Sequence, residues 1–272
     1  MNNPLMPKKV RTSHLAGFKQ TGQKFSCLTS YDQLTASIFD EAGIEVILVG
    51  DSAADNALGY ETTLPISVEE IIPFGRAVAG AVSRGLVVVD MPFGSYELGP
   101  EQALENAIRI MKQTGADAVK LEGGTRSAEQ IKAITTAGIP VMAHIGFTPQ
   151  SVNNLGGFKV QGRGDGADAL IADAAAVDAA GAFAVVLELV PGELAKEITS
   201  TFAIPTIGIG AGPDTDGQIL VWTDFAGLSA HKPKKFVKQY AQLRATLIEA
   251  AQSYRNEVLD GTFPEASRSF ED

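Results

Sequence analysis

Short apolar runs rich in valine and isoleucine recur along the chain, and each is followed by a polar or glycine-containing turn and then by a helical pattern. Continuous runs of this kind are typical of strands that are buried on both faces of a sheet. Eight strands are therefore predicted: Phe25–Thr29, Glu45–Gly50, Leu86–Met91, Ala118–Gly123, Val141–Gly146, Ala184–Val190, Thr206–Gly212 and Ala226–Ser229.

Helical patterns fill the intervals between these runs, and glycine precedes several of the next strands, as expected where a helix ends. The predicted helices are Asp32–Ala42, Val68–Ser83, Pro100–Thr114, Ala128–Ala137, Ala167–Ala180, Glu193–Phe202 and Thr215–Val221, with a last helix at roughly Pro233–Tyr254 after strand eight.

Strands that alternate with helices indicate a parallel sheet covered by helices. Eight such units favour a closed barrel over an open doubly wound sheet, and no linker interrupts the series. We therefore predict an α/β fold, a (βα)8 TIM barrel. It would form a single catalytic domain over residues 1–272, with residues 1–24 as an N-terminal extension packing on the barrel.

Polar residues interrupt the apolar runs where the predicted strands end, which is where barrels of this kind carry their chemistry. Lys120 and Glu122 are two apart on one strand and so point to the same side of the sheet. One interpretation makes such charges helix caps or members of a structural ion-pair network. Charges at the ends of four different strands favour a functional site instead. The candidates are Asp51, Ser52, Asp90, Lys120, Glu122, His144 and Glu188.

Three of these candidates, Asp51, Asp90 and Glu122, form an all-oxygen set that suits a hard cation such as Mg2+. His144 is read as a histidine of the core or one that supports other ligands, in preference to a catalytic group. The glycine-rich run 207–212 is either a phosphate cradle or a place where chain segments pack closely. It lacks the spacing of a nucleotide-binding fingerprint.

Two predicted connections, 51–67 and 147–166, are longer than a tight turn between a strand and a helix. Long loops in compact domains are often lids or binding loops. In a barrel, both would stand on the catalytic face, so we predict that they cover the site.

Composition narrows the classes of function. A net charge of −10 over 272 residues argues against a nucleic-acid partner. No window approaches the roughly 18 apolar residues of a membrane span, and the basic N-terminus lacks the apolar stretch of a secretory signal. The single Cys27 excludes a disulfide framework. A soluble protein in the reducing cytoplasm is predicted.

Nine motifs at and around the strand ends occur in the order of a known family, from about Thr12 to Phe263. They are Leu28–Asp32, Leu48–Ser52, Asp90–Tyr96, Val119–Gly124, His144–Ser151, Gly156–Arg163, Leu187–Glu188 with Val190–Pro191, Ile207–Gly212 and Asp216–Trp222. On these motifs the chain resembles the 3-methyl-2-oxobutanoate hydroxymethyltransferase family, also called ketopantoate hydroxymethyltransferase.

The resemblance implies one Mg2+ per subunit at Asp51, Asp90 and Glu122, and binding of the oxo acid by Asp51, Ser52, Asp90 and Lys120. Glu188 is the implied proton acceptor. The implied reaction passes through a Mg2+-stabilised enolate. It transfers a hydroxymethyl group from 5,10-methylenetetrahydrofolate to 3-methyl-2-oxobutanoate and forms 2-dehydropantoate for pantothenate and coenzyme A biosynthesis.

The resemblance also implies a homo-oligomer, commonly a decamer of two stacked five-membered rings. The chain departs from the family pattern at Ser30, at 73–75 and at Thr223, which bears on subtype and folate contacts.

Two alternatives stay open on the sequence. One is an enolate-forming lyase or mutase of the phosphoenolpyruvate mutase and isocitrate lyase group, although its Lys-Lys-Cys-Gly-His run is absent here. The other is a barrel that binds an organic acid without catalysis.

Overall fold

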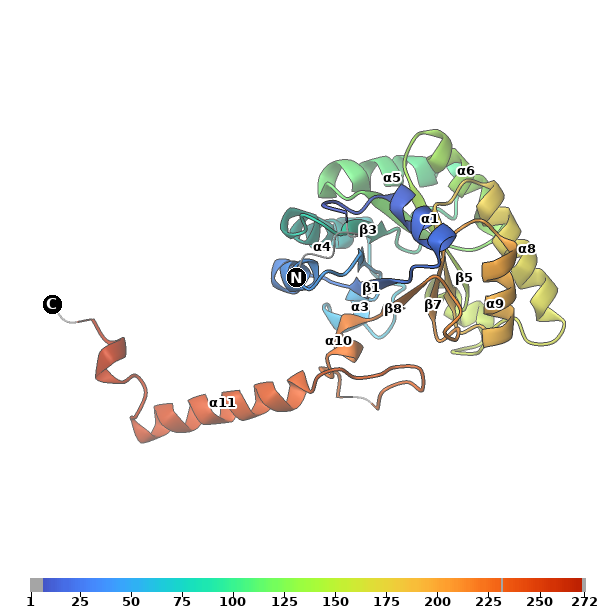
Figure 1. Ribbon diagram of the computed structural model, residues 1–272. Helices are drawn as coiled ribbons and strands as arrows, with labels where there is room; N and C mark the ends of the chain where they lie inside the picture. The colour runs from blue at the N-terminus through green and yellow to red at the C-terminus, as the bar shows by residue number, and fades with distance from the viewer. Residues whose placement is uncertain (1–6, 231, 271–272) are drawn as a thin grey trace. The chain divides into compact units, whose positions relative to one another are not determined.

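The computed structural model describes residues 7–230 and 232–270 (Figure 1). The chain forms two compact units, Met1–Val221 and Trp222–Asp272. The first contains the whole sheet. Of the helices in the described residues, none is both long and apolar enough to cross a membrane.

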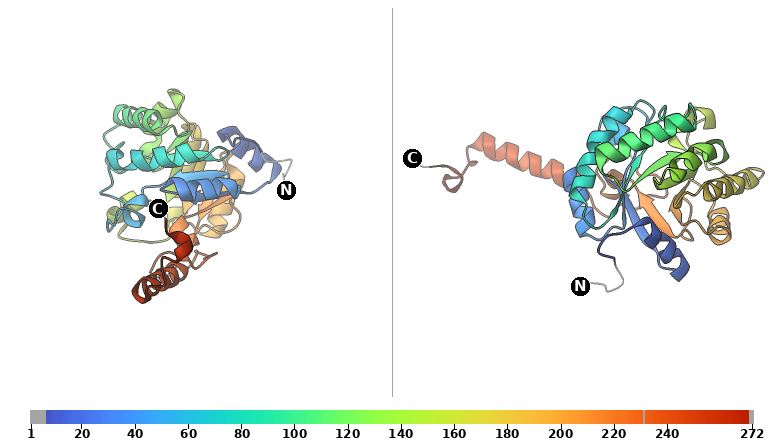
Figure 2. Two further views of the ribbon diagram at one scale, coloured as in Figure 1. Left: turned by 90° about the vertical axis from the view of Figure 1, so that its left-hand side faces the viewer. Right: turned by 90° about the horizontal axis from the view of Figure 1, so that it is seen from above.

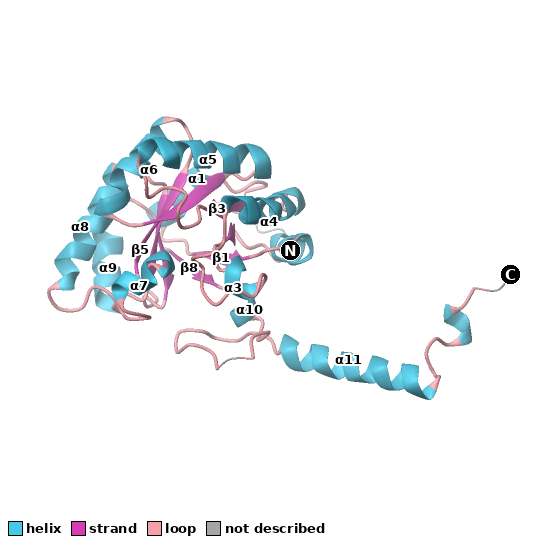
Figure 3. Ribbon diagram, turned by 180° about the vertical axis from the view of Figure 1, so that it is seen from behind, coloured by secondary structure: helices cyan, strands magenta, loops and turns pink. Residues whose placement is uncertain are grey.

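Eight parallel strands close into a barrel in chain order, with the last strand beside the first (Figure 3). This confirms the predicted (βα)8 fold. The strands are β1 (Phe25–Thr29), β2 (Val46–Val49), β3 (Leu86–Asp90), β4 (Ala118–Glu122), β5 (Val141–Gly146), β6 (Ala184–Glu188), β7 (Thr206–Ile209) and β8 (Gly217–Leu220).

Helices surround this sheet, as the view from above in Figure 2 shows. They are α1 (Thr12–Thr21), α2 (Gln33–Glu41), α4 (Val68–Ala81), α5 (Pro100–Thr114), α6 (Ala128–Thr136), α8 (Gly166–Ala179) and α9 (Gly192–Thr201). Short α3 (Ala53–Asn56) lies in the first long connection, and the turn η2 (Pro149–Ser151) and short α7 (Val152–Leu155) lie in the second. A further single turn, η1 (Thr125–Ser127), follows β4.

Local sequence signals fix where several helices begin. Asp32 caps α2 by accepting hydrogen bonds from the backbone N–H groups of Leu34 and Thr35. Ser67 and Glu70 form a reciprocal capping box at the start of α4. These caps place the helices directly after their strands or loops, which leaves the strand ends free to carry other side chains.

Alternate strand positions point into the barrel and set the site above the core. Leu86 and Val88 of β3 and Val186 of β6 belong to one buried apolar cluster inside the barrel. Two residues further along each strand, and so pointing the same way, are Asp90 on β3 and Glu188 on β6. The apolar layers therefore form the floor on which the charged layer stands.

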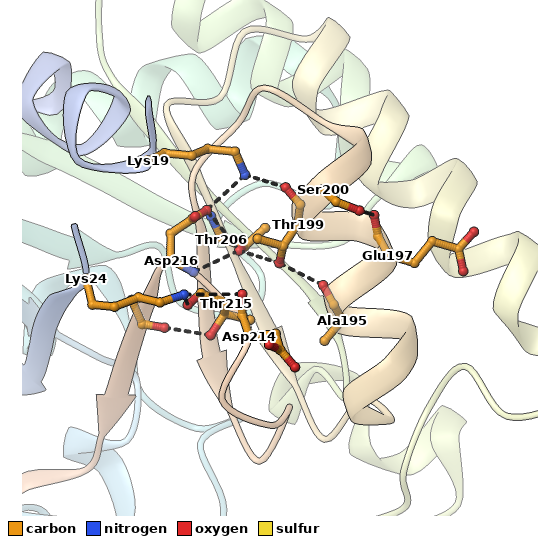
Figure 4. Close-up of polar contacts among 11 residues, drawn as sticks. Lys19, Lys24, Ala195, Glu197, Thr199, Ser200, Thr206, Asp214, Thr215 and Asp216 are labelled. Atoms are coloured by element: carbon orange, nitrogen blue, oxygen red, sulfur yellow. Dashed lines mark hydrogen bonds and ion pairs between the residues drawn. The ribbon is translucent and has the colours of Figure 1, made fainter. Parts of the chain in front are cut away.

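The N-terminal end of the barrel is closed by α1, a helix that the sequence did not predict. Leu15 and Phe18 of α1 belong to the same apolar cluster, and the ring of Phe18 lies 6.2 Å from that of Phe25. Lys19 donates hydrogen bonds to Asp216 Oδ2 at 2.9 Å and to the Thr199 carbonyl at 2.7 Å (Figure 4). These bonds tie α1 to the segments that lead into β7 and β8.

Two predicted elements near the end of the series are wrong. Strand eight is β8 (Gly217–Leu220), inside the predicted helix Thr215–Val221, and the segment Ala226–Ser229 is no strand. Gly227 makes a turn there with φ 65°, and a Cβ on it would lie 2.4 Å from the Ala241 carbonyl oxygen. The short Gly-Gln-Ile-Leu strand gave too little periodic signal to be separated from a helix.

The second unit consists of α10 (Trp222–Phe225), α11 (Leu243–Asp260) and the turn η3 (Ala266–Arg268). The predicted last helix therefore starts ten residues too early, because the lysine-rich stretch after Pro233 is irregular up to Gln242. No residue of α11 is buried, although the helix carries several large apolar side chains: Leu243, Leu247, Ile248, Tyr254, Val258 and Leu259.

Asp40 anchors the connection into β3 and gives a stability prediction. Its carboxylate accepts bonds from the backbone N–H groups of Ser83 at 2.9 Å, Arg84 at 3.1 Å and Gly85 at 2.6 Å. Burial tends to raise the pKa of Asp40, but the bonds from Gly85, Ser83 and Arg84 outweigh it and hold the pKa below its ordinary value.

We expect Asp40→Asn to lower the free energy of unfolding by about 2 kcal/mol at pH 7, because bonds to a charged acceptor are lost. A lowered folded-state pKa gives stability above the unfolded pKa that disappears as pH falls through the folded pKa. The gap between wild type and variant should therefore shrink in urea titrations from pH 7 to pH 3. Glu105→Gln, at an exposed position of α5, is the control. An unchanged gap at pH 3 would contradict this account.

Candidate active site

A charged layer lies at the C-terminal ends of the strands, and the strand register brings its members side by side. Asp90 is paired with Lys120 across β3 and β4, and Glu122 with His144 across β4 and β5. Glu188 of β6 lies opposite Gly146 of β5. The predicted site residues therefore come from neighbouring strands of one barrel end.

Lys120 and Asp90 form a buried ion pair in the centre of this layer. The Lys120 Nζ donates to both Asp90 oxygens, at 2.8 and 2.7 Å. The backbone N–H of Asp51 donates to Asp90 Oδ2 at 3.1 Å, which brings the end of β2 to the same carboxylate. An ammonium group has three N–H donors, so Lys120 keeps one beyond its two bonds to Asp90.

Ser52 is held from the side of β1. Its hydroxyl oxygen lies 2.7 Å from that of Tyr31, and Thr29 in turn donates to the Tyr31 hydroxyl at 3.1 Å. Tyr31 is buried, and burial raises the pKa of its phenol well above the ordinary value despite its hydrogen bonds with Ser52 and Thr29. The phenol therefore stays protonated and acts as a fixed hydrogen-bonding group for Ser52.

His144 stands between two carboxylates. Its Nδ1 lies 3.4 Å from Glu122 Oε1 and its Nε2 lies 3.3 Å from Glu188 Oε2. Neither contact is aligned as a hydrogen bond, so Glu122 Oε1 and both ring nitrogens are buried polar atoms without a hydrogen-bond partner among the described residues. His144 thus lies inside the site, and Glu122 Oε1 is available to another ligand.

The backbone around Glu188 is unusual. Leu189, the next residue, has φ 49° and is the one non-glycine residue with positive φ in the described part of the chain. Its N–H donates to the Ile209 carbonyl at 2.9 Å. Gly146 has φ 89°, and a Cβ there would lie 2.4 Å from the Glu188 carbonyl oxygen. Rare backbone conformations of this kind cluster at functional sites.

Four carboxyl groups, of Asp51, Asp90, Glu122 and Glu188, share the site with two basic side chains, and the directions of the pKa shifts agree with this excess of acids. Burial, together with Asp51 and Glu122, raises the pKa of Asp90 to about 7 against the opposing effect of Lys120. Burial also raises the pKa of Glu122.

The two cations of the site respond in the same sense. Burial tends to lower the pKa of Lys120, but Asp90, Asp51 and Glu122 outweigh it and raise the pKa above its ordinary value. Burial and Lys120 tend to lower the pKa of His144, yet Glu122 and Glu188 raise it to about 9. The site therefore favours an additional positive charge.

These donors fit a hard divalent cation. Asp51, Asp90 and Glu122 are buried oxygen donors, and Glu122 Oε1, 3.4 Å from His144 Nδ1, has no hydrogen-bond partner among the described residues. Within the described residues, no three His, Cys, Asp or Glu side chains are grouped closely enough to hold a metal ion by themselves. Mg2+ does not require one, because it is usually held by one or two carboxylates together with waters and substrate oxygens.

Two further residues of the site were missed by the sequence analysis. Gln150, in η2, donates to Asp51 Oδ2, and Tyr96, in the loop after β3, donates to Gln150 Oε1. Both are buried. The sequence carries two signals for them: they lie in loops after strands three and five, on the face where barrel chemistry occurs, and inside the motifs Asp90–Tyr96 and His144–Ser151.

The glycine-rich run 207–212, which begins inside β7, is explained by close packing. A Cβ on Gly208 would lie 2.7 Å from Thr215 Oγ1, and a Cβ on Gly212 would lie 3.0 Å from Gly192 Cα. Of the two interpretations of this run, the contacts support the packing role.

Comparison with known proteins shows which family the chain is similar to. A family model described as ketopantoate hydroxymethyltransferase matches residues 9–266. A 3-methyl-2-oxobutanoate hydroxymethyltransferase from Leifsonia xyli subsp. xyli is 61% identical over 264 residues, which cover 97% of this chain and 95% of the relative. One from Mycobacterium tuberculosis is 60% identical over 262 residues, covering 96% and 93%.

Solved structures with the same fold are more distant. A phosphonopyruvate hydrolase in complex with oxalate and Mg2+ has a TM-score of 0.61 at 14% identity, covering 97% of this chain and 92% of that one. A 2,3-dimethylmalate lyase of the phosphoenolpyruvate mutase and isocitrate lyase superfamily has a TM-score of 0.60 at 15% identity, covering 97% and 90%. At this identity the likeness shows the fold alone.

Proposed function

The chain belongs to the ketopantoate hydroxymethyltransferase family and is an enzyme of that kind, and we propose that it transfers a hydroxymethyl group from 5,10-methylenetetrahydrofolate to 3-methyl-2-oxobutanoate. The products are 2-dehydropantoate and tetrahydrofolate. The observation that carries the proposal is the gathering of Asp90, Lys120, Glu122 and His144 on adjacent strand ends, with Glu188 Oε2 3.3 Å from His144.

The reaction needs a base, a group that stabilises negative charge and a site that binds the oxo acid. Glu188 takes the proton from C3 of the oxo acid, and charge moves onto the 2-oxo oxygen. C3 then bonds to the one-carbon unit, whose bonds to the folate nitrogens break. One water is consumed, and its oxygen becomes the hydroxyl of the new group. The two folate nitrogens take up the second proton of this water and the proton that Glu188 removed from C3.

Asp51, Asp90 and Glu122 would hold the Mg2+ in this proposal. When bound, the cation would supply Lewis acidity toward the 2-oxo group. Support comes from the buried all-oxygen donor set and from Glu122 Oε1, which has no hydrogen-bond partner among the described residues. The fold is compatible with a divalent metal, since it is shared with a phosphonopyruvate hydrolase crystallised with Mg2+.

Lys120 and Ser52 contact the oxo acid in this account. Lys120 has one N–H donor beyond its bonds to Asp90, and it directs that donor at the developing enolate oxygen. Ser52, fixed by Tyr31, donates to the substrate carboxylate. The loops 51–67 and 147–166 lie over the folate and exclude water from the enolate.

Product formation tests the proposal. The purified protein is incubated with Mg2+, 5,10-methylenetetrahydrofolate and 3-methyl-2-oxobutanoate, and 2-dehydropantoate is measured by mass spectrometry. We expect product in the complete mixture and none when either organic substrate is omitted. Phosphonopyruvate is the control for the lyase and mutase alternative, and it should remain intact. Turnover of phosphonopyruvate with no 2-dehydropantoate would overturn the proposal.

The metal donors give a second prediction. Asp90→Asn and Glu122→Gln keep size but remove charge, so each should weaken Mg2+-dependent binding of the oxo acid about tenfold while the fold is retained. Titration calorimetry with and without EDTA measures the affinity, and circular dichroism checks the fold. Glu105→Gln on the outer helix α5 is the matched control. Wild-type affinity in both site variants would refute the metal assignment.

We also propose that the enzyme is a homo-oligomer in the cytoplasm. The family resemblance implies that this oligomer is a decamer. The support is α11, which exposes Leu247, Tyr254 and Leu259 with no buried residue of its own. Exposed apolar side chains in this number suit a protein interface. Light scattering on the purified protein should give about ten times the mass of one chain, and the mass of a monomer would contradict the proposal.

A further inference from the structure

Gln150 lies where three strand ends meet, in the turn after β5. It is 5% exposed, and its polar atoms have partners from three other strand ends. Nε2 donates to Asp51 Oδ2 at 3.1 Å and to the Met91 carbonyl at 3.1 Å, while its backbone N–H donates to Glu122 Oε2 at 3.0 Å. One residue therefore binds two of the three carboxylates proposed to hold the metal.

The orientation of the Gln150 amide is fixed by its neighbours. The Met91 carbonyl only accepts hydrogen bonds, so the side-chain atom that faces it must be the NH2 group. That same nitrogen faces Asp51. On the other side, the Tyr96 hydroxyl donates to Oε1 at 2.5 Å and itself accepts from the Glu122 backbone N–H at 3.3 Å.

The division of oxygens in these bonds is informative. Gln150 binds Oδ2 of Asp51 and Oε2 of Glu122. The other oxygen of Glu122, Oε1, is buried and has no hydrogen-bond partner among the described residues. Each bond therefore fixes one oxygen of a carboxylate and orients the group. On Glu122 the second oxygen lies 3.4 Å from His144 Nδ1 without a hydrogen bond, so it can still accept another ligand.

We infer that Gln150, held by Tyr96, is a positioning residue that orients the carboxylates of Asp51 and Glu122 for the cation. Residues that hydrogen-bond to metal-binding carboxylates fix their direction, and losing one typically weakens metal affinity roughly 10- to 100-fold. The inference rests on the proposed function, since it concerns the metal and oxo-acid site of that reaction.

Two variants test this role. Gln150→Ala removes the amide and keeps the backbone bond to Glu122, and it should weaken Mg2+ affinity in the presence of 3-methyl-2-oxobutanoate roughly 10- to 100-fold. Tyr96→Phe removes the hydroxyl that locks the amide and accepts the Glu122 backbone N–H, but it keeps both bonds from Gln150 to the carboxylates, so a smaller loss of a few-fold is expected. Titration calorimetry gives the affinities, and thermal unfolding in EDTA gives the stability of each metal-free protein.

A matched control is Gln102→Ala. Gln102 is a partly exposed residue of α5 whose amide also makes two bonds, to the Gly94 carbonyl and from the Leu98 N–H. Its loss should leave the Mg2+ affinity unchanged. If Gln150 had a purely structural role, Gln150→Ala would lower the melting temperature, but the folded molecules would keep the wild-type Mg2+ affinity.

The outcomes distinguish the positioning role of Gln150 from the proposed function on which it rests. Weakened affinity in Gln150→Ala and Tyr96→Phe, with Gln102→Ala unaffected, supports the positioning role. If the Mg2+ affinities of Gln150→Ala and Tyr96→Phe both lie within twofold of the wild-type value, the positioning role is overturned and the proposed function still stands. A wild-type protein that shows no Mg2+-dependent binding of the oxo acid overturns the proposed function and this inference with it.

Discussion

Glu188→Gln should lower turnover of 3-methyl-2-oxobutanoate roughly 100- to 10,000-fold, the usual contribution of a positioned base. The substitution keeps the size of the side chain and removes its basic oxygen. Because the proposed metal donors come from β2, β3 and β4, substrate and Mg2+ should still bind within a few-fold of wild type. Steady-state kinetics give the turnover, and titration calorimetry gives the affinity.

The control for this prediction is Glu193→Gln, an exposed acid in the first turn of α9, just beyond the same strand. It should leave both quantities unchanged. Loss of binding in parallel with turnover in Glu188→Gln would assign Glu188 to substrate binding and would contradict its role as the base.

Lys120→Ala should lower kcat on the order of 100-fold, because the charge-assisted contact to the developing enolate oxygen is worth about 3 kcal/mol in the barrier. The variant also leaves Asp90 buried without its ammonium partner. Asp90 has a pKa of about 7 even beside Lys120, so it takes up a proton in the variant and limits the loss of stability near neutral pH.

The sign of the pH dependence follows from that raised pKa. A folded-state pKa above the unfolded value means that the folded protein binds more protons, so stability falls as pH rises. The stability loss of Lys120→Ala should therefore be larger at pH 8 than at pH 6 in urea titrations. Exposed Lys132, on α6, gives the control Lys132→Ala. A variant with normal kcat and only lowered stability would make Lys120 a structural ion-pair partner.

Most of the barrel could be predicted because its strands carry strong local signals. In the run Leu-Val-Val-Val-Asp, Asp90 points to the same side of the strand as Leu86 and Val88. The structure has β3 over the same residues. The prediction of the eighth strand failed for the opposite reason. Its four residues carry little apolar signal, and it is a strand because it pairs with both β1 and β7 to close the barrel.

The predicted site residues lie together because the ends of parallel strands meet at one edge. Their specific partners could not be read from the sequence. His144 contacts Glu122 and Glu188 through the register of β4, β5 and β6, and that register depends on tertiary pairing. Gln150 was missed because loop residues give no periodic pattern.

Exchange of the C3 proton tests the central claim, that this site forms an enolate through Glu188 before the folate reacts. The oxo acid is incubated in D2O with Mg2+ and no folate, and loss of the C3 proton signal is followed by NMR for wild type and Glu188→Gln. We expect exchange by the wild type and a rate at least about 100-fold lower in the variant. Exchange by Glu188→Gln at the wild-type rate would show that another group is the base.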